Sequence, residues 1–194
     1  MIAIIKYNAG NVQSVQYALQ RIGAESQVTD DIDFIQQANK VIFPGVGHAE
    51  AAMESLHESG LTQVIAGLKQ PVLGICLGMQ LMGKHTEEGN TSCLGIFDTD
   101  IQIFQSATFK VPQVGWNNIY DYRSVLFEGL EEAAFVYTVH SYYAAVSINT
   151  VAQTNYILPY SAALQKNNFY GVQFHPEKSG LVGEMILRNF IEKT

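Results

Sequence analysis

Up to residue 83, short apolar runs alternate with longer stretches in which apolar residues recur every three or four positions. The apolar runs predict buried strands at residues 2–7, 26–29, 40–43 and 71–75. The amphipathic stretches predict helical segments at residues 11–22, 30–38, 49–58, 61–68 and 77–83. Strands that alternate with helices in this way favour parallel pairing in an α/β sheet.

The pattern changes after residue 89, where runs rich in aromatic residues follow one another without long helices. These runs predict strands at residues 94–104, 119–122 and 135–146, then a hairpin formed by residues 161–165 and 169–174. An amphipathic helix is predicted at residues 179–191. We therefore expect one domain over residues 1–194 with an α/β fold. Its central sheet is expected to be open, mostly parallel, flavodoxin-like and flanked by helices, with an antiparallel extension in the second half.

Composition excludes some functions. Apolar residues make up 47% and charged residues 15% of the 194 residues, so a sizeable core is expected. The net charge of -7 argues against nucleic-acid binding, which needs a basic surface. No apolar run approaches the roughly 18 residues of a membrane span. Cys76 and Cys93 show no disulfide framework, which favours reduced thiols and a cytoplasmic protein.

Cys76 lies where the fourth predicted strand meets the next predicted helix, with Gly74 and Gly78 on either side. A residue at a sharp strand-to-helix turn projects out of the sheet, and small neighbours allow the bend. The N-terminus of the following helix favours thiolate over thiol. Cys76 is therefore a candidate nucleophile. The alternative is a buried structural cysteine, since free cysteine is among the most buried residue types.

His175 and Glu177 follow the last predicted strand, and residues two apart on an extended chain point the same way. A carboxylate in that place can orient the imidazole, whose other nitrogen can then take a proton from a nucleophile. Cys76, His175 and Glu177 thus form a candidate triad, although His175 by itself would suit a structural role. No metal-ligand spacing occurs, and we predict neither a metal nor a cofactor.

The Pro-Gly-Val-Gly segment at 44–47 follows the third predicted strand. Position 50 holds Glu50 in place of a third glycine, and no Lys-Ser or Lys-Thr pair follows, which argues against a phosphate-binding loop. Because ligands bind beyond the carboxyl ends of parallel strands, this loop could donate a backbone N–H toward the group that Cys76 attacks. A plain turn is the alternative. The Leu77 amide, at a helix start, is a candidate oxyanion donor.

Two motifs, Gly-Ile-Cys-Leu-Gly-Met-Gln at 74–80 and Gln-Phe-His-Pro-Glu at 173–177, resemble those of the class I (triad) glutamine amidotransferases. Further segments resemble the glutaminase subunits that serve histidine biosynthesis, and they lie at 44–47, 110–117, 139–143 and 171–179. The likeness runs from residue 2 to residue 190. The loop at 6–11 departs from the family pattern, and Gln113 and Val114 stand where His-Met is usual.

The resemblance implies a glutaminase that hydrolyses L-glutamine to glutamate and ammonia. The ammonia would be channelled, within a heterodimer, to a (β/α)₈-barrel cyclase that forms imidazole glycerol phosphate, a lyase reaction of the complex. The resemblance also assigns the second oxyanion donor to Val46. It assigns substrate binding to Gly47, Gln80, Glu88, Ser141 and Tyr142. We expect the partner interface at Lys110, Trp116 and Lys178, although Lys178 would also suit a solvated charge.

The glycines on both sides of Val46 suggest a loop peptide that flips when the partner binds its ligand. Three other functions remain open at this stage. The chain could be the glutaminase subunit of a different ammonia-using synthase, a stand-alone cysteine hydrolase, or a non-catalytic binding module with the same fold. Activity without a partner, on substrates other than glutamine, would distinguish the second of these.

Overall fold

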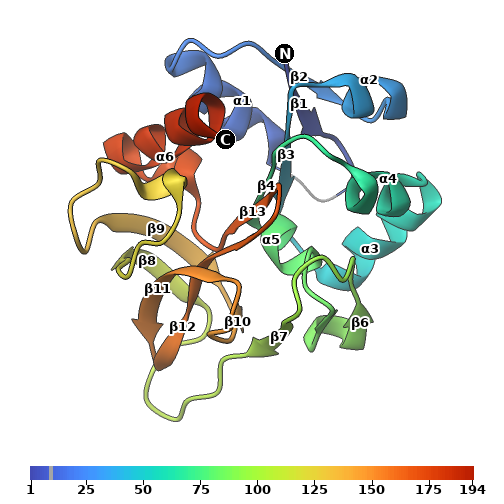
Figure 1. Cartoon of the computed structure of the whole chain (residues 1–194). Coiled ribbons are helices and arrows are strands. Elements are labelled where there is room, and N and C mark those ends of the chain that lie inside the picture. Colours follow the sequence, from blue (N-terminus) through green and yellow to red (C-terminus); the bar gives the residue numbers. More distant parts are fainter. Residues whose placement is uncertain (9–10) are drawn as a thin grey trace.

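A computed structural model describes residues 1–8 and 11–194, and its centre is a seven-stranded sheet (Figure 1). The strands run in the order β11-β12-β13-β4-β3-β1-β2. Their bounds are Thr150–Tyr156, Leu158–Lys166, Phe169–Val172, Val72–Cys76, Lys40–Gly45, Ile2–Ile5 and Ser26–Thr29. Pairing is parallel from β13 to β2 and antiparallel among β11, β12 and β13. This confirms the predicted mostly parallel sheet with an antiparallel extension.

Helices cover both faces of this sheet (Figure 1). The six helices in the described residues are α1 Val12–Arg21, α2 Ile32–Gln37, α3 Ala49–Glu58, α4 Leu61–Gly67, α5 Leu77–Leu81 and α6 Gly180–Lys193. One core cluster contains buried residues of α1 and α6, and the other contains buried residues of α2, α3, α4 and α5. Every predicted helical segment is present, although α1 and α5 are two residues shorter and α2 is three residues shorter than expected. Among residues 1–8 and 11–194, no helix is long and apolar enough to cross a membrane.

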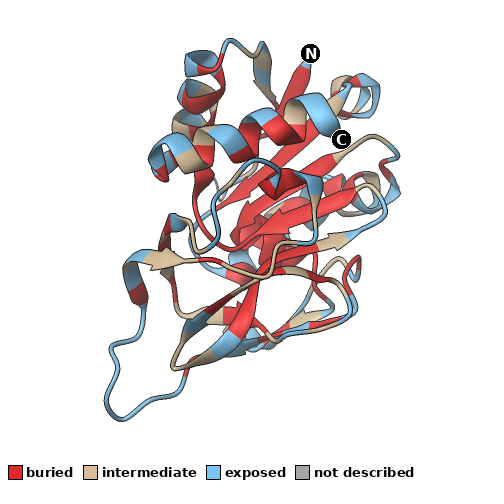
Figure 2. Ribbon diagram, turned by 60° about the vertical axis from the view of Figure 1, so that its left-hand side comes forward, coloured by how far each residue is buried: buried red, intermediate tan, exposed pale blue. Residues whose placement is uncertain are grey.

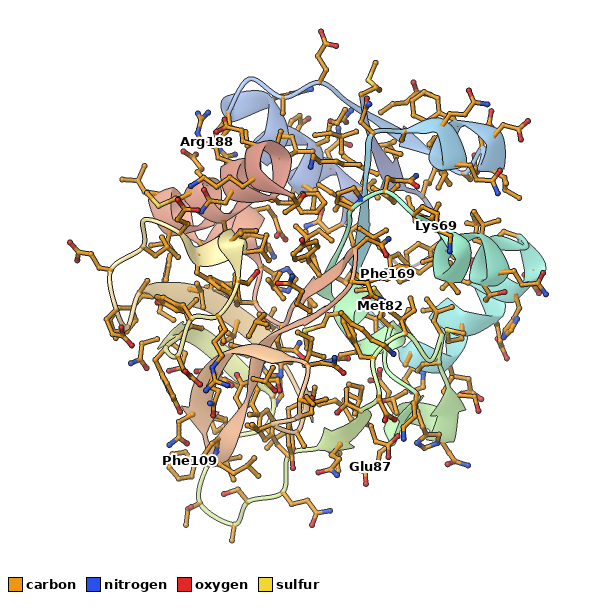
Figure 3. The ribbon with its side chains drawn as sticks, viewed as in Figure 1. Lys69, Met82, Glu87, Phe109, Phe169 and Arg188 are labelled. Atoms are coloured by element: carbon orange, nitrogen blue, oxygen red, sulfur yellow. The ribbon has the colours of Figure 1, made fainter. Side chains whose placement is uncertain are left out.

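Alternate residues of the central strands serve the two core clusters. In β1, Ile2 and Ile4 pack with α1 and α6, whereas Ala3 and Ile5 pack on the opposite face. Figure 2 shows the resulting buried layer through the middle of the molecule. Met82 and Phe169, which belong to the cluster with α3 and α4, lie near the middle of Figure 3. Burial on both faces explains why these strands are continuous apolar runs.

The second half contains two smaller sheets. The first pairs β10 (Tyr142–Ala144), β7 (Asp100–Ile103), β5 (His85–Thr86) and β6 (Thr91–Ser92). The second pairs β8 (Gln113–Asn118) with β9 (Phe135–His140). Short 3₁₀ turns occur at Glu88–Asn90, Val125–Phe127 and Pro176–Lys178.

Here several predicted strands were wrong. The strand expected at 94–104 is limited to β7, because the backbone of residues 94–97 hydrogen-bonds to the end of α5 and its following turn. The strand expected at 119–122 is only an isolated bridge at Tyr120, and β8 precedes it. The run at 135–146 is divided at Ser141 into two strands in different sheets. Strands β5, β6, β8 and β11 were not predicted. The loop at 6–11, where the sequence departs from the family pattern, lies partly outside the described residues.

Candidate active site

Cys76 occupies the sharp turn between β4 and α5. Its φ of 53° lies in the left-handed region that non-glycine residues rarely adopt, so the surrounding structure must impose it. A Cβ at Gly78 would lie 1.9 Å from the Phe43 carbonyl oxygen in β3. Glycine at position 78 therefore lets the start of α5 pack directly against the neighbouring strand. The turn is the strand-to-helix geometry that the sequence predicted.

His175 and Glu177 form a buried pair, with 2.8 Å between His175 Nδ1 and Glu177 Oε1 and side chains 2% exposed each. The expected reason for the pairing was wrong. Strand β13 ends at Val172, and Glu177 lies in the 3₁₀ turn at Pro176–Lys178. The two side chains meet because the chain folds back after His175, whereas the prediction relied on an extended chain.

Strand β9 holds this turn in place. The His175 amide donates to the Tyr137 carbonyl, at 2.9 Å. The Ser179 hydroxyl donates to the His175 carbonyl and accepts from the Tyr137 amide, 3.0 Å away. Ser179 and Tyr137 were not identified from the sequence, because their contacts join segments about 40 residues apart.

The pKa of His175 is governed by opposing effects. Burial of the ring lowers it, but the nearby Cys76 sulfur and the paired Glu177 carboxylate outweigh burial and raise the pKa to about 10. His175 Nε2 is buried and has no partner with hydrogen-bond geometry among the described residues. With Nδ1 engaged by Glu177, Nε2 is the nitrogen that can exchange a proton with a neighbouring group.

Cys76 and His175 open into one cavity of about 280 Å³. Such a volume is at the small end for ligand pockets and suits a molecule of amino-acid size. Its lining includes every predicted substrate-binding and oxyanion-hole residue, namely Val46, Gly47, Leu77, Gln80, Glu88, Ser141 and Tyr142. Pro112, Val139 and His140 also line it, and all three lie in the segments at 110–117 and 139–143 that resemble the family. Glu177 lies behind His175 and does not line the cavity.

Polar contacts fix the walls of this cavity. Glu88 Oε2 accepts a hydrogen bond from the Ala49 amide at the start of α3, at 2.8 Å. Gln80 Nε2 donates to the Tyr142 carbonyl, at 3.0 Å, and His140 Nδ1 donates to the same carbonyl, at 2.7 Å. Burial lowers the pKa of His140 to about 4, so this ring is neutral at neutral pH and serves to hold the backbone of Tyr142.

Only the second half of the Pro-Gly-Val-Gly segment lies in a loop. Strand β3 continues to Gly45, so the connection to α3 consists of residues 46–48. Gly47 has a φ of 102°, which an L-residue rarely adopts. The Tyr7 hydroxyl donates to the Pro44 carbonyl, at 2.9 Å, and anchors the end of the strand.

The three residues expected at a partner interface are all exposed, but they do not form one cluster. Trp116 on β8 is 57% exposed, and its ring centroid lies 6.0 Å from that of Tyr137 on β9. Lys178 Nζ lies 6.0 Å from the same Tyr137 ring. Lys110 lies apart, where its carbonyl accepts from the Tyr156 hydroxyl, on the segment that carries Phe109 (Figure 3).

Trp116 belongs to an exposed apolar face of the β8–β9 pair. The register places Val114 opposite Val139, Trp116 opposite Tyr137 and Asn118 opposite Phe135. Since facing residues of paired strands share one side, the apolar members of this set form a continuous surface, here called the apolar ribbon: Val114, Trp116, Phe135, Tyr137 and Val139. Val139 also lines the cavity, so the ribbon extends from the edge of the site.

The fold and this site define a class of protein, and comparison with known proteins agrees. The family model described as glutamine amidotransferase class-I matches residues 3–194, and the chain belongs to this family. The predicted family is thereby confirmed. A solved structure described as a glutamine amidotransferase superimposes with a TM-score of 0.74 at 15% identity, over 98% of this chain and 97% of that one.

Individual relatives carry more specific names than the family model. The chain is 58% identical to the imidazole glycerol phosphate synthase subunit HisH of Bacteroides fragilis, and the alignment covers 98% of each chain. It is 55% identical to the subunit of the same name from Bacteroides thetaiotaomicron, again over 98% of each.

Proposed function

We propose that this chain is the glutaminase subunit of an imidazole glycerol phosphate synthase, acting in histidine biosynthesis. The observation that carries the proposal is the meeting of Cys76 with the His175–Glu177 pair at one small cavity. The names of the relatives at 58% and 55% identity support the choice of synthase. Cytoplasmic location is part of the proposal, since its chemistry needs a reduced Cys76 thiol.

The triad residues have distinct roles in this mechanism. The Cys76 thiolate attacks the side-chain amide carbon of glutamine, and His175 carries the proton taken from the thiol. When the tetrahedral intermediate collapses, the C–N bond breaks and His175 protonates the leaving nitrogen, which departs as ammonia. Water, deprotonated by His175, then cleaves the glutamyl thioester to glutamate and restores the thiolate. Glu177 orients His175 throughout and stabilises its charged form.

Backbone amides would stabilise the oxyanion of both tetrahedral intermediates. The Leu77 amide follows the nucleophile, and the Val46 amide belongs to the short connection beside it; both residues line the cavity. Donors of this kind contribute about 2.7–4 kcal/mol each to transition-state stabilisation. Gly47, with its positive φ, allows the Val46 peptide to change orientation, and we propose that a partner-induced flip completes the oxyanion hole.

The remaining lining residues would hold the amino-acid end of glutamine. Glu88 supplies a carboxylate for the α-ammonium group, and Ser141 supplies a donor for the α-carboxylate. Gln80, Tyr142 and the backbone of Gly47 complete the set. Both N–H groups of Gln80 are engaged, by the Tyr142 carbonyl and the Gln173 side chain, so only its Oε1 is free to contact substrate.

The product requires a partner, because ammonia released into water at neutral pH is protonated and ceases to be a nucleophile. We propose that a (β/α)₈-barrel cyclase covers the site, forms a heterodimer with this chain and receives ammonia through a channel. The apolar ribbon, with Trp116 at its centre, is the proposed docking surface, and Lys178 and Lys110 supply charged contacts around it. An exposed apolar surface beside a polar pocket is typical of interaction sites.

The test is glutamine hydrolysis by the purified chain, alone and with a cyclase barrel loaded with its ribotide ligand. We expect weak activity alone and a steep rise in the complex, and Cys76→Ala provides the blank. High activity of the chain alone, unchanged by the cyclase, would support the catalytic triad but contradict the proposed partner. Hydrolysis of other amides without a partner would instead identify a stand-alone cysteine hydrolase.

A further inference from the structure

Gln173 is a buried polar residue beside Cys76 to which the mechanism above assigns no role. Parallel pairing aligns Val172 of β13 with Ile75 of β4, so the next residues, Gln173 and Cys76, leave the sheet side by side. Gln173 is 1% exposed. Its side-chain nitrogen Nε2 lies 3.7 Å from the Cys76 sulfur, within hydrogen-bond reach for a sulfur acceptor.

A chain of hydrogen bonds determines which end of the Gln173 amide faces the sulfur. The Tyr142 carbonyl can only accept, so the Gln80 atom 3.0 Å away must be its NH₂ group. The same NH₂ group lies 3.0 Å from the Gln173 side chain, which must present its oxygen there. The NH₂ group of Gln173 is consequently directed at Cys76. The Tyr142 carbonyl thus determines, through Gln80, which end of the Gln173 amide contacts the nucleophile.

The Cys76 sulfur has two contacts of opposite character. The Val139 carbonyl, 3.9 Å away, can only accept a hydrogen bond, so its partner is the Cys76 thiol. The Gln173 N–H can only donate, and donation is strongest to a charged acceptor. We propose that Gln173 donates a hydrogen bond to the Cys76 thiolate and stabilises it for attack, with Gln80 holding the donor in place. This inference rests on the proposed role of Cys76 as nucleophile.

The titratable groups that influence the sulfur come from other elements and would be the same in a Gln173 variant. They are His175, with Glu177 behind it, and the buried hydroxyls of Tyr7 and Tyr160. A change at Gln173 therefore removes one donor and no charge.

The test measures alkylation of Cys76 by iodoacetamide in the full-length chain, from about pH 5 to about pH 10, with the labelled peptide quantified by mass spectrometry. Gln173→Met has nearly the same volume but no donor. We expect its alkylation rate at neutral pH to fall at least about tenfold and its pH profile to move upward by about one unit. Gln70→Met, which removes a glutamine whose amide donates to the Ile35 carbonyl in α2 and which does not line the cavity, is the matched control.

A second readout is glutamine hydrolysis in the complex with the cyclase, where Gln173→Met is expected to lower kcat about tenfold and leave KM within about twofold. Gln173→Glu keeps an oxygen for Gln80 and is expected to slow alkylation as well, since a carboxyl group faces the sulfur. An unchanged alkylation profile in both variants, or an equal change in Gln70→Met, would overturn the inference. Because alkylation needs neither glutamine nor partner, failure of the wild type to hydrolyse glutamine would refute the proposed function separately.

Discussion

The catalytic cavity and the apolar ribbon share strand β9 but differ in how their residues are held. At the cavity, His175 is buried, its ring is paired with buried Glu177, and its backbone is fixed by hydrogen bonds with Tyr137 and Ser179. On the ribbon, Trp116 and Phe135 are 57% and 60% exposed. The two regions meet at Val139, which lines the cavity and also belongs to the exposed face.

The two regions suit different tasks, catalysis in the cavity and partner binding on the apolar ribbon. Buried polar groups in a low-dielectric site keep their orientation and interact strongly, which catalysis requires. Exposed apolar groups gain free energy only when a partner covers them, which suits docking. Substitutions in the cavity should therefore act on the reaction, and substitutions on the ribbon should act on association. Single substitutions in each region can test that division.

Replacing Cys76 with alanine should abolish glutamine hydrolysis, with a loss of at least about 10⁴-fold in kcat, because no other group can form the thioester. Glutamate production by the complex is the measurement. Cys93→Ala is the matched control, and it should retain activity, since burial raises the pKa of the Cys93 thiol to about 12 and keeps it protonated. Comparable loss in both variants would contradict the assignment.

Glu177→Gln should lower kcat about 10²–10³-fold, because the imidazolium of His175 loses its charged partner. Stability should respond as well. His175 has a pKa of about 10 in the folded chain, against about 6.5 when unfolded. The protonated ring thus contributes stability that is complete below about pH 6.5 and is lost as pH rises toward 10. Urea titrations at several pH values should show that the free energy of unfolding declines less with rising pH in Glu177→Gln than in the wild type. An equal decline in both proteins would argue against the coupling of His175 with Glu177.

Gly78→Ala should reduce the free energy of unfolding by about 2–3 kcal/mol, because its Cβ would lie 1.9 Å from the Phe43 carbonyl oxygen. Gly67→Ala is the matched control, since no atom lies within 4 Å of a Cβ built there. That substitution, at the end of a helix, should be neutral or slightly stabilising. Urea denaturation distinguishes the two, and equal stability of both variants would show that the Cys76 turn tolerates a looser packing.

Trp116→Ala should weaken binding to the cyclase about tenfold, as expected for a central aromatic residue of an interface. The free energy of unfolding should change by less than about 0.5 kcal/mol, because the side chain is largely exposed. Calorimetric titration of the cyclase with this chain measures the first effect. Ile148→Ala, at a side chain that is 97% exposed and outside the ribbon, should bind as the wild type does. An unchanged affinity of Trp116→Ala for the cyclase would show that the apolar ribbon is not the docking surface.

The parallel half of the sheet could be predicted closely from the sequence. Its strands other than the edge strand β2 are buried on both faces, and its helices are amphipathic, so each of these elements has a local pattern of its own. The predicted bounds of β2 and α3 are those observed. The Cys76 turn was also evident, because Gly74 and Gly78 are local requirements of the bend. The family motifs added the substrate-binding residues, all of which line the cavity.

The second half was harder because its apolar residues have mixed roles. Ile96 and Phe97 are buried beside the end of α5 without pairing as a strand, whereas Val114 and Trp116 are in a strand but exposed. Hydrophobic periodicity assumes that apolar means buried and that burial follows the period of the element. Both assumptions fail where a segment covers a helix end or presents an apolar surface.

By itself, the sequence determined the α/β architecture, the nucleophile turn and the residue types of the site, since all three depend on neighbours within a few positions. Only the tertiary structure decided which distant groups meet. The parallel register of β13 with β4 brings Gln173 to Cys76, and the contacts of Ser179 with Tyr137 set the turn that pairs His175 with Glu177. Contacts of this kind depend on strand register and long-range packing, which local sequence pattern does not encode.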